Sequence, residues 1–137
     1  MATRKIALVT GASSGIGRQF AMELAQNGYD IVAVARRREL LESLASELQK
    51  FDAQTRVVVA DLSTGAGVQS VIDAAINADF LVLNAGITRA ARVGTIPKDE
   101  IANLNTLLAT GVVEVCEAIV PQMVQRKTGD VVIVSSI

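Results

Sequence analysis

Short apolar runs alternate along this chain with longer stretches in which apolar residues recur every three or four positions. The runs are nearly continuous, which is typical of strands buried on both faces of a parallel sheet. We predict strands over residues 6–10, 31–35, 56–60, 80–83 and 131–135. The alternation of strands and helical segments predicts an α/β fold, in which helices cover both faces of one parallel sheet.

The helical segments between these strands each present an apolar face. Their spacing predicts helices around residues 16–25, 40–48 and 68–75, and a longer helix from about Asp99 to Gln125. The last helix is apolar over much of its circumference, so its surface either covers the sheet of its own chain or meets a second chain. No repeat or linker interrupts the pattern, and we expect a single domain over residues 1–137.

The composition narrows the classes of partner. The 13 Lys and Arg nearly balance the 14 Asp and Glu, and there is no His, so the net charge of −1 does not favour nucleic acid or an anionic membrane as a partner. Cys116 is the sole cysteine, which excludes an internal disulfide, and no metal site is predicted. We find neither a secretory signal nor a run of ~20 apolar residues that would span a bilayer. We therefore expect a cytoplasmic protein.

Three glycines follow the first predicted strand, and a helix begins among them. Gly11 permits a tight exit from the strand, Gly15 leaves room for a pyrophosphate, and Gly17 lets the helix pack closely on the sheet. The N-terminus of that helix offers unpaired N–H groups to phosphate. Glycines in this strand-to-helix context predict a site for the phosphates of a nicotinamide cofactor.

The glycine spacing also carries a family resemblance. Residues 10–17, Thr-Gly-Ala-Ser-Ser-Gly-Ile-Gly, resemble the signature of the short-chain dehydrogenase/reductase family. The pair at residues 61–62 is similar to the adenine-contacting Asp-Leu of that family, and residues 84–86 are similar to the end of its Asn-Asn-Ala-Gly turn, with Leu83 in place of the first Asn. The resemblance extends from the first strand to Ser136. It implies a doubly wound Rossmann sheet with strand order 3-2-1-4-5, continued by further strands and helices beyond the 137 residues.

The same resemblance implies which residues bind the cofactor. They are Thr10, Gly11, Ser13, Ser14, Gly15, Ile16, Gly17, Asp61, Leu62, Asn84, Ala85 and Gly86. Members of the family often have a basic residue just before the second glycine. This chain has Ser14 there, so Ser13 is the expected alternative ligand for a phosphate.

The residues after the second predicted strand bear on the choice of cofactor. An NAD-type site has an acidic residue at this tip, whereas this chain has Ala35 followed by Arg36, Arg37 and Arg38. A guanidinium binds the 2′-phosphate of NADP through charge-assisted hydrogen bonds, so Arg36 and Arg37 predict NADP rather than NAD. The alternative is that the arginines are simply solvated at the start of a helix.

The family resemblance also implies a catalytic Ser, Tyr and Lys, assisted by an Asn on the long helix. Ser136 matches the catalytic serine. The Tyr-x-x-x-Lys segment is expected beyond the 137 residues, because the one tyrosine, Tyr29, precedes the second strand. Leu108 occupies the position of the helix Asn, with Asn105 one turn earlier on the same side and Asn103 off that face.

Two functions remain open at this point. The first is the N-terminal portion of an NADP-dependent oxidoreductase that transfers hydride between NADP(H) and a carbonyl or secondary alcohol, with residues 1–137 inactive by themselves. The second is a non-catalytic NADP-binding or subunit-interaction domain. The resemblance also implies a homo-oligomer formed through the long helix, residues 99–125, while the covering of its own sheet is the alternative use of that apolar face.

Overall fold

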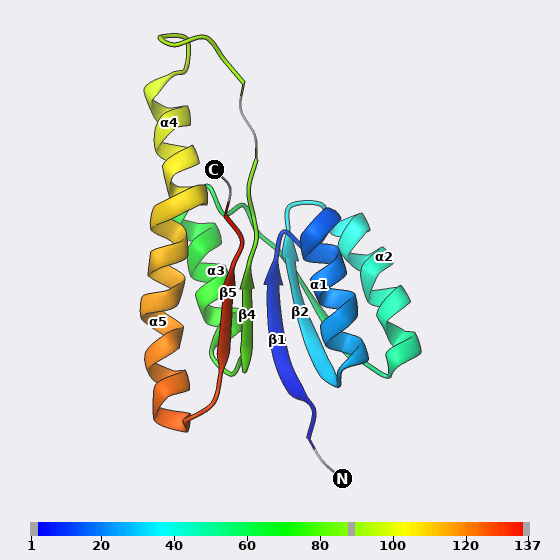
Figure 1. The fold of residues 1–137 in the computed structure, drawn as a ribbon. Helices are drawn as coiled ribbons and strands as arrows, with labels where there is room; N and C mark the ends of the chain where they lie inside the picture. The colour runs from blue at the N-terminus through cyan, green and yellow to red at the C-terminus, as the bar shows by residue number, and fades with distance from the viewer. Residues whose placement is uncertain (1–2, 88–89, 136–137) are drawn as a thin grey trace.

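The computed structural model describes residues 3–87 and 90–135. Its strands are β1 (Lys5–Thr10), β2 (Tyr29–Ala35), β3 (Thr55–Val59), β4 (Phe80–Leu83) and β5 (Asp130–Ile133). All pair in parallel in the order β3-β2-β1-β4-β5 (Figure 1). The structure thus confirms the α/β class and the strand order 3-2-1-4-5.

Helices cover both faces of this sheet, as the apolar runs require. They are α1 (Gly15–Gln26) and α2 (Arg38–Leu48) on one face, and α3 (Gly65–Ala75) and α5 (Gly111–Arg126) on the other. A short 3₁₀ turn, Gln49–Phe51, follows α2. Successive residues of β1 point to opposite faces, so that Val9 joins the core under α1 and α2, and Leu8 joins the core under α3 and α5.

The long helix predicted over residues 99–125 is divided into three parts. Helix α4 (Lys98–Asn105) leads into a π-helical turn, Thr106–Thr110, which continues directly into α5. The N–H of Gly111 donates to the Thr106 carbonyl, five residues back. A Cβ at Gly111 would lie 2.6 Å from that carbonyl oxygen and 3.0 Å from Val68 Cγ2 of α3. The glycine thus allows both the wide turn and the close approach of α5 to α3.

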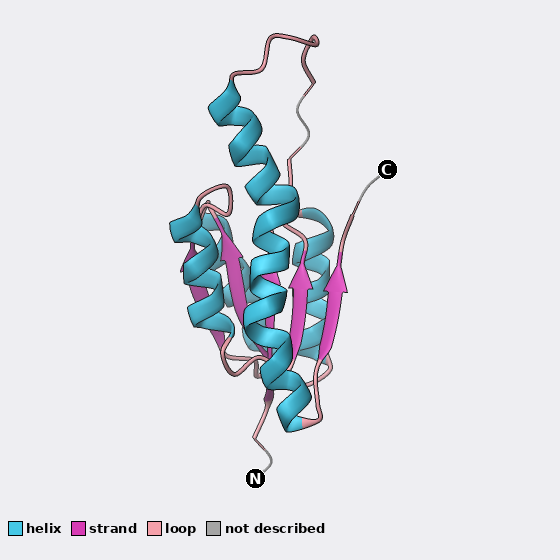
Figure 2. Ribbon diagram, turned by 90° about the vertical axis from the view of Figure 1, so that its left-hand side faces the viewer, coloured by secondary structure: helices cyan, strands magenta, loops and turns pink. Residues whose placement is uncertain are grey.

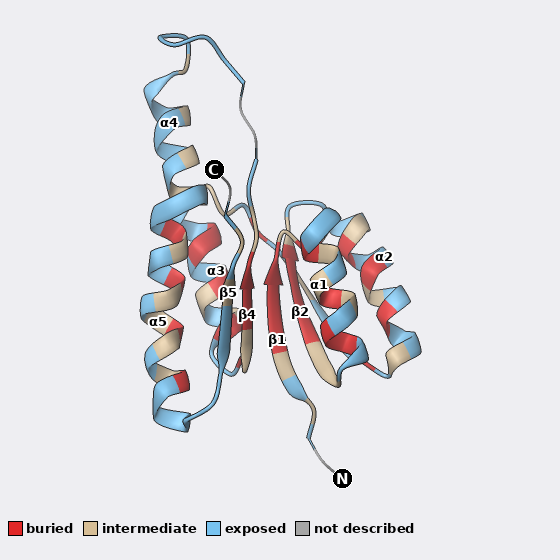
Figure 3. Ribbon diagram, viewed as in Figure 1, coloured by how far each residue is buried: buried red, intermediate tan, exposed pale blue. Residues whose placement is uncertain are grey.

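Helix α4 rises beyond the carboxyl ends of the strands (Figure 2). None of its residues is buried (Figure 3). Together with α5 it forms a continuous helix, Lys98–Arg126, which is long and apolar enough to cross a membrane, with a mean hydropathy of 1.6 over its most apolar window. The helix has no long run of consecutive apolar residues, so its sequence did not predict this property. Val115 and Ile119 pack against the sheet, so the position of a crossover helix explains the apolar character of that one face. Only 22% of the apolar window is buried, so other apolar residues of this helix remain exposed.

Strand β5 is the outer strand among the described residues. It ends at Ile133 rather than at residue 135, and only β4 pairs with it in the described part of the chain. The apolar run predicted a buried strand, but Val131 and Ile133 are 37% and 52% exposed. Val131 and Ile133 share one face of the strand, and Val132 on the other face is less exposed, so the missing cover belongs to one face of β5.

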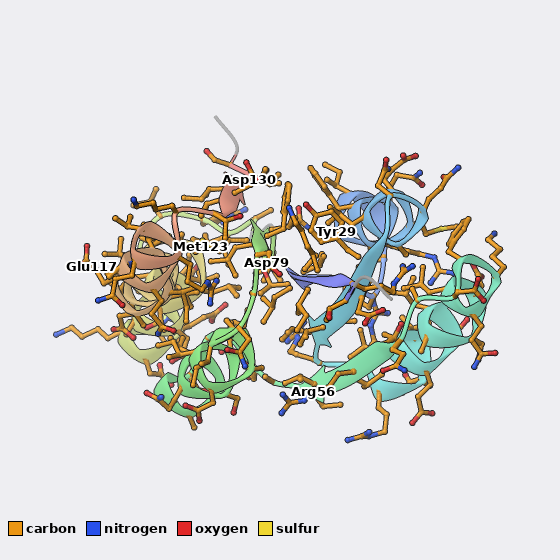
Figure 4. The ribbon with its side chains drawn as sticks, turned by 90° about the horizontal axis from the view of Figure 1, so that it is seen from below. Tyr29, Arg56, Asp79, Glu117, Met123 and Asp130 are labelled. Carbon is orange, nitrogen blue, oxygen red and sulfur yellow. The ribbon has the colours of Figure 1, made fainter. Side chains whose placement is uncertain are left out.

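The amino ends of the strands are joined by Asp79, which precedes β4 (Figure 4). Its carboxylate Oδ2 accepts from the N–H of Ile6 at 2.9 Å, and its own N–H donates to the Ile6 carbonyl at 2.7 Å. The Asp79 carbonyl also accepts from the N–H of Asp130 at 3.0 Å. Polar groups at this end of the sheet therefore hold β1, β4 and β5 in register.

Candidate functional site

A cavity of about 390 Å³ lies at the carboxyl ends of β1 to β4. This is where the strand order reverses, between β1 and β4, and where open parallel sheets bind ligands. Four strand ends and one face of α4 line the cavity. The lining residues are Gly11, Ser13, Ser14, Val34, Ala35, Arg36, Arg37, Ala60, Asp61, Leu62, Ser63, Asn84, Ala85, Gly86, Ile87, Glu100, Asn103, Leu104 and Leu107.

The glycine loop has the conformation that its glycines permit. Gly11 and Gly15 have left-handed φ angles of +64° and +57°, which favour glycine. A Cβ at Gly15 would meet no atom within 4 Å, so the space above the loop is open. A Cβ at Gly17 would collide with the Gly11 carbonyl and lie 2.6 Å from Asn84 Nδ2. The close packing expected at Gly17 is therefore present.

Thr10 is a positioning residue beneath the cavity, and it is only 2% exposed. Its Oγ1 accepts hydrogen bonds from the N–H groups of Asn84, at 2.9 Å, and Ala85, at 3.1 Å, and donates to the Val82 carbonyl at 3.4 Å. The hydroxyl thus fastens the end of β1 to the end of β4. Four of the predicted cofactor-binding residues are not among the residues that line this cavity: Thr10 at the end of β1, and Gly15, Ile16 and Gly17 in the first turn of α1.

The arginines that follow β2 divide into two groups. Arg36 and Arg37 are exposed and line the cavity together with Ser13 and Ser14 of the glycine loop. Arg38 begins α2, and its Nη1 lies 3.9 Å from a Glu42 carboxylate oxygen in the next turn. Only the first two arginines therefore contribute positive charge to the cavity.

Asp61 contributes negative charge at the end of β3. Its Oδ1 accepts from the Ser63 hydroxyl at 2.7 Å and from the Ser63 N–H at 3.0 Å. These two bonds, the hydroxyl first, lower the pKa of Asp61 below its usual value of 3.8, slight desolvation opposes them, and the charge of Arg36 adds to the lowering. At neutral pH the carboxylate is therefore ionised and faces a cavity that also contains guanidinium groups.

One face of α4 forms the remaining wall, which the sequence analysis did not predict. Glu100, Asn103 and Leu104 of α4, with Leu107 of the π turn, have the spacing i, i+3, i+4, i+7 of a single helical face, and we call these four residues the α4 wall. That spacing is visible in the sequence and could have predicted that these four residues share one side of the helix. Leu107 and Leu62 also line a small apolar cavity of about 20 Å³ beneath this wall, so the base of the wall adjoins the end of β3.

The π turn decides which residues of this helix reach the cavity. Leu108 is 53% exposed, and its Cδ2 lies 3.5 Å from where a Cβ on Gly86 would be. Asn105, expected one turn before Leu108 on the same side of the helix, is not among the residues that line the cavity, whereas Asn103, expected off that face, is. The uniform α-helical period assumed from the sequence does not include the wider turn at residues 106–110.

Known proteins share this sequence pattern and this fold. The family model described as short chain dehydrogenase matches residues 5–137. The chain belongs to the short-chain dehydrogenase family. An uncharacterized oxidoreductase of Myxococcus xanthus is 34% identical over 137 residues, which cover 97% of this chain and 54% of that protein.

Solved short-chain dehydrogenase structures superpose closely. The bulky-bulky ketone specific alcohol dehydrogenase from Comamonas testosteroni has a TM-score of 0.93 at 28% identity, covering 99% of this chain and 56% of that one. A short-chain dehydrogenase from Sphingobium yanoikuyae in complex with NADPH has a TM-score of 0.91 at 31% identity, covering 97% and 54%. The chain thus spans about half the length of the relatives it matches.

The predicted catalytic serine of this short-chain dehydrogenase, Ser136, lies outside the described residues. The residue before it, Ser135, is exposed and follows β5. Because β5 is parallel to its neighbours, it ends at the same edge of the sheet as the strands that line the cavity.

Proposed function

We propose that this short-chain dehydrogenase binds NADP(H) in the cavity and serves hydride transfer between NADP(H) and a carbonyl or secondary alcohol. The observation that carries the proposal is the pairing of Arg36 and Arg37 with Ser13 and Ser14 in one part of the cavity. Guanidinium and hydroxyl groups in this arrangement suit a phosphate. NADP(H) supplies the hydride when bound.

The cofactor's phosphates fit the chemistry of this region. A side chain at Gly15 would project into the open space above the loop, which a pyrophosphate needs. The helix α1 begins there with Ser14 as N-cap, and its first N–H groups favour an anion. Arg36 and Arg37 would hold the 2′-phosphate, where an acidic residue in place of Ala35 would repel it. The solved relatives include an NADPH complex and an NAD+-bound xylitol dehydrogenase, so the choice of NADP rests on these arginines.

The covalent structure of the cofactor then orients the rest of it. The 2′-phosphate is attached to the ribose that carries adenine, so adenine would lie near Arg36, between the end of β3 and the α4 wall. The nicotinamide would extend the other way, past Ala85 and Gly86, toward the end of β5, after which Ser136 is the proposed catalytic serine. Residues 1–137 contain one tyrosine, at the start of β2, so we expect no turnover from these residues alone.

The direct test replaces single arginines with aspartate, which reverses the charge at that position. In Arg36→Asp the 2′-phosphate loses a charged partner and meets a carboxylate, so we expect the Kd for NADPH to rise by at least about tenfold while the Kd for NADH changes little. Arg38→Asp is the matched control, because it makes the same change in net charge outside the cavity. Equal affinity for NADPH in both variants would contradict the proposal.

A second proposal concerns the outer face of the helix Lys98–Arg126. Ile101, Val113 and Val124 are 52%, 59% and 68% exposed. Val113 and Val124 are 11 residues apart, which is about three turns of α-helix. Ile101 and Val113 are 12 residues apart, and the π turn between them accounts for the extra residue. They therefore lie on one side of the helix as a stripe of exposed apolar residues about three turns apart, which supports homo-oligomerisation through it. A subunit-interaction domain without catalysis would use the same stripe.

A further inference from the structure

The α4 wall has two polar residues, Glu100 and Asn103, and Asn103 is the uncharged one of the two. Asn103 lies one turn above Leu107, and Leu107 adjoins Leu62 at the base of the wall. Both leucines are partly buried, whereas Asn103 is exposed. The wall thus presents apolar side chains at its base, the Asn103 amide beside Leu104 higher up, and the Glu100 side chain one turn beyond Asn103.

The opposite side of this part of the cavity is formed by Asp61, Leu62 and Ser63. The Arg36 and Arg37 region accounts for phosphate, and the strip between β3 and α4 is where the proposed orientation puts adenine. Apolar side chains such as Leu62 and Leu104 suit the faces of a purine. The edge of adenine carries an amino donor next to a ring-nitrogen acceptor, and both need polar partners.

An asparagine amide has one acceptor and one donor group at matching separation, which is why Asn pairs with the N6 and N7 atoms of adenine in other settings. Resting on the proposed NADP(H) function, we propose that Asn103 is an adenine-selecting residue. Its Oδ1 accepts one N6 hydrogen and its Nδ2 donates to the adjacent ring nitrogen. The Asp61 carboxylate accepts the second N6 hydrogen.

The π turn provides the geometric basis for this assignment. It aligns Leu107 with Gly111 and Val115 on the side facing α3, since all three line the small apolar cavity there. Asn103 then points to the main cavity and Asn105 does not. The two asparagines are two positions apart, which is about 200° around the helix. They differ in direction but not in chemistry or exposure.

The experiment titrates three proteins with two cofactors. Wild type, Asn103→Ala and Asn105→Ala are each titrated with NADPH and with its reduced hypoxanthine analogue, in which a carbonyl replaces the N6 amine. We expect wild type to bind NADPH more tightly than the analogue. Asn103→Ala should raise the Kd for NADPH about fivefold. It should also reduce the preference for adenine, because the analogue has no N6 hydrogen and so does not make the bond that the substitution removes. Asn105→Ala should behave as wild type, and thermal unfolding should confirm that both variants fold.

Three outcomes would overturn the inference. An unchanged Kd for NADPH in Asn103→Ala would show that Asn103 does not contact the cofactor. An equal rise in the Kd for NADPH and for the analogue would show that Asn103 does not select adenine. Equal effects of the two substitutions would mean that the side of the helix does not matter. In all three cases NADPH binding by wild type, and its sensitivity to Arg36→Asp, would leave the proposed function standing. Failure of wild type to bind NADPH would instead refute the proposed function and the inference with it.

Discussion

Single residues set the shape of the cavity before any ligand enters it. Thr10 joins the ends of two strands through one hydroxyl, and Gly17 lets α1 begin against the turn at Gly11. Both residues can be required for cofactor binding without contacting the cofactor themselves. Their effect is therefore expected first in the stability of the fold.

Gly17→Ala should lower the free energy of unfolding by about 1–3 kcal/mol, since the added methyl meets the Gly11 carbonyl and the Asn84 side chain. Gly65→Ala is the control. At Gly65, in the first turn of α3, a Cβ meets nothing within 4 Å, so we expect no loss or a gain of up to ~1 kcal/mol. Urea unfolding of both variants makes the comparison, and equal destabilisation would contradict the packing described here.

Asp61 gives a prediction about pH. Its folded-state pKa is lowered, so its contribution to stability is present above pH 3.8 and is lost as the pH falls through the lower folded value. Ser63→Ala removes the hydroxyl that is the largest cause and should raise the pKa of Asp61 toward its usual range. An NMR titration of the Asp61 carboxyl measures this. Ser70→Ala, whose hydroxyl bonds the Ala66 carbonyl instead, should leave that pKa unchanged. If the two variants titrate alike, Ser63 does not control the carboxylate.

At the scale of elements, the π turn links α4 to the core through Gly111. Gly111→Ala should cost about 1–3 kcal/mol, because the methyl group meets the Thr106 carbonyl and Val68. The displaced α4 wall should also weaken NADPH binding, an effect that Gly65→Ala lacks. Unfolding and binding measured on the same variants test this pair of effects. Loss of stability with full NADPH affinity would show that the wall does not contribute to the site.

The apolar pattern predicts the elements well where burial is complete. Strands β1 and β2, their parallel arrangement and the helices on them follow directly from it. The glycine loop and the strand order follow instead from the glycine motif and the family resemblance. Strand β5 also follows from the apolar pattern, but its exposure does not, because exposure depends on what packs on the strand in space. The π turn was not predicted, because a uniform α-helical period was assumed through residues 106–110. The same turn explains why Asn105 was expected near the cavity and Asn103 was not.

At the scale of the whole molecule, the long helix has two faces with different uses. Val115, Ile119 and Met123 are buried in the core, while the stripe of Ile101, Val113 and Val124 is exposed. The need to cover the sheet therefore explains the apolar character of the buried face of this helix only. The other supports the proposed assembly.

We expect light scattering to report a dimer or larger oligomer for wild type, and a smaller species for Val113→Glu, because a charge in the middle of the stripe opposes its burial. Gln125→Glu is the control, because it adds the same charge to an exposed position of the same helix about 120° around the axis from Val113. A monomeric wild type, or an unchanged mass for Val113→Glu, would contradict assembly through this stripe.

The central claim is that the cavity at the carboxyl ends of the strands is an NADP(H) site. Parallel titrations of the wild-type chain with NADPH and NADH, followed by calorimetry, test it most directly. Charge-assisted hydrogen bonds from Arg36 and Arg37 to the 2′-phosphate predict that NADPH binds at least about tenfold more tightly. Equal affinities, or tighter binding of NADH, would contradict this account.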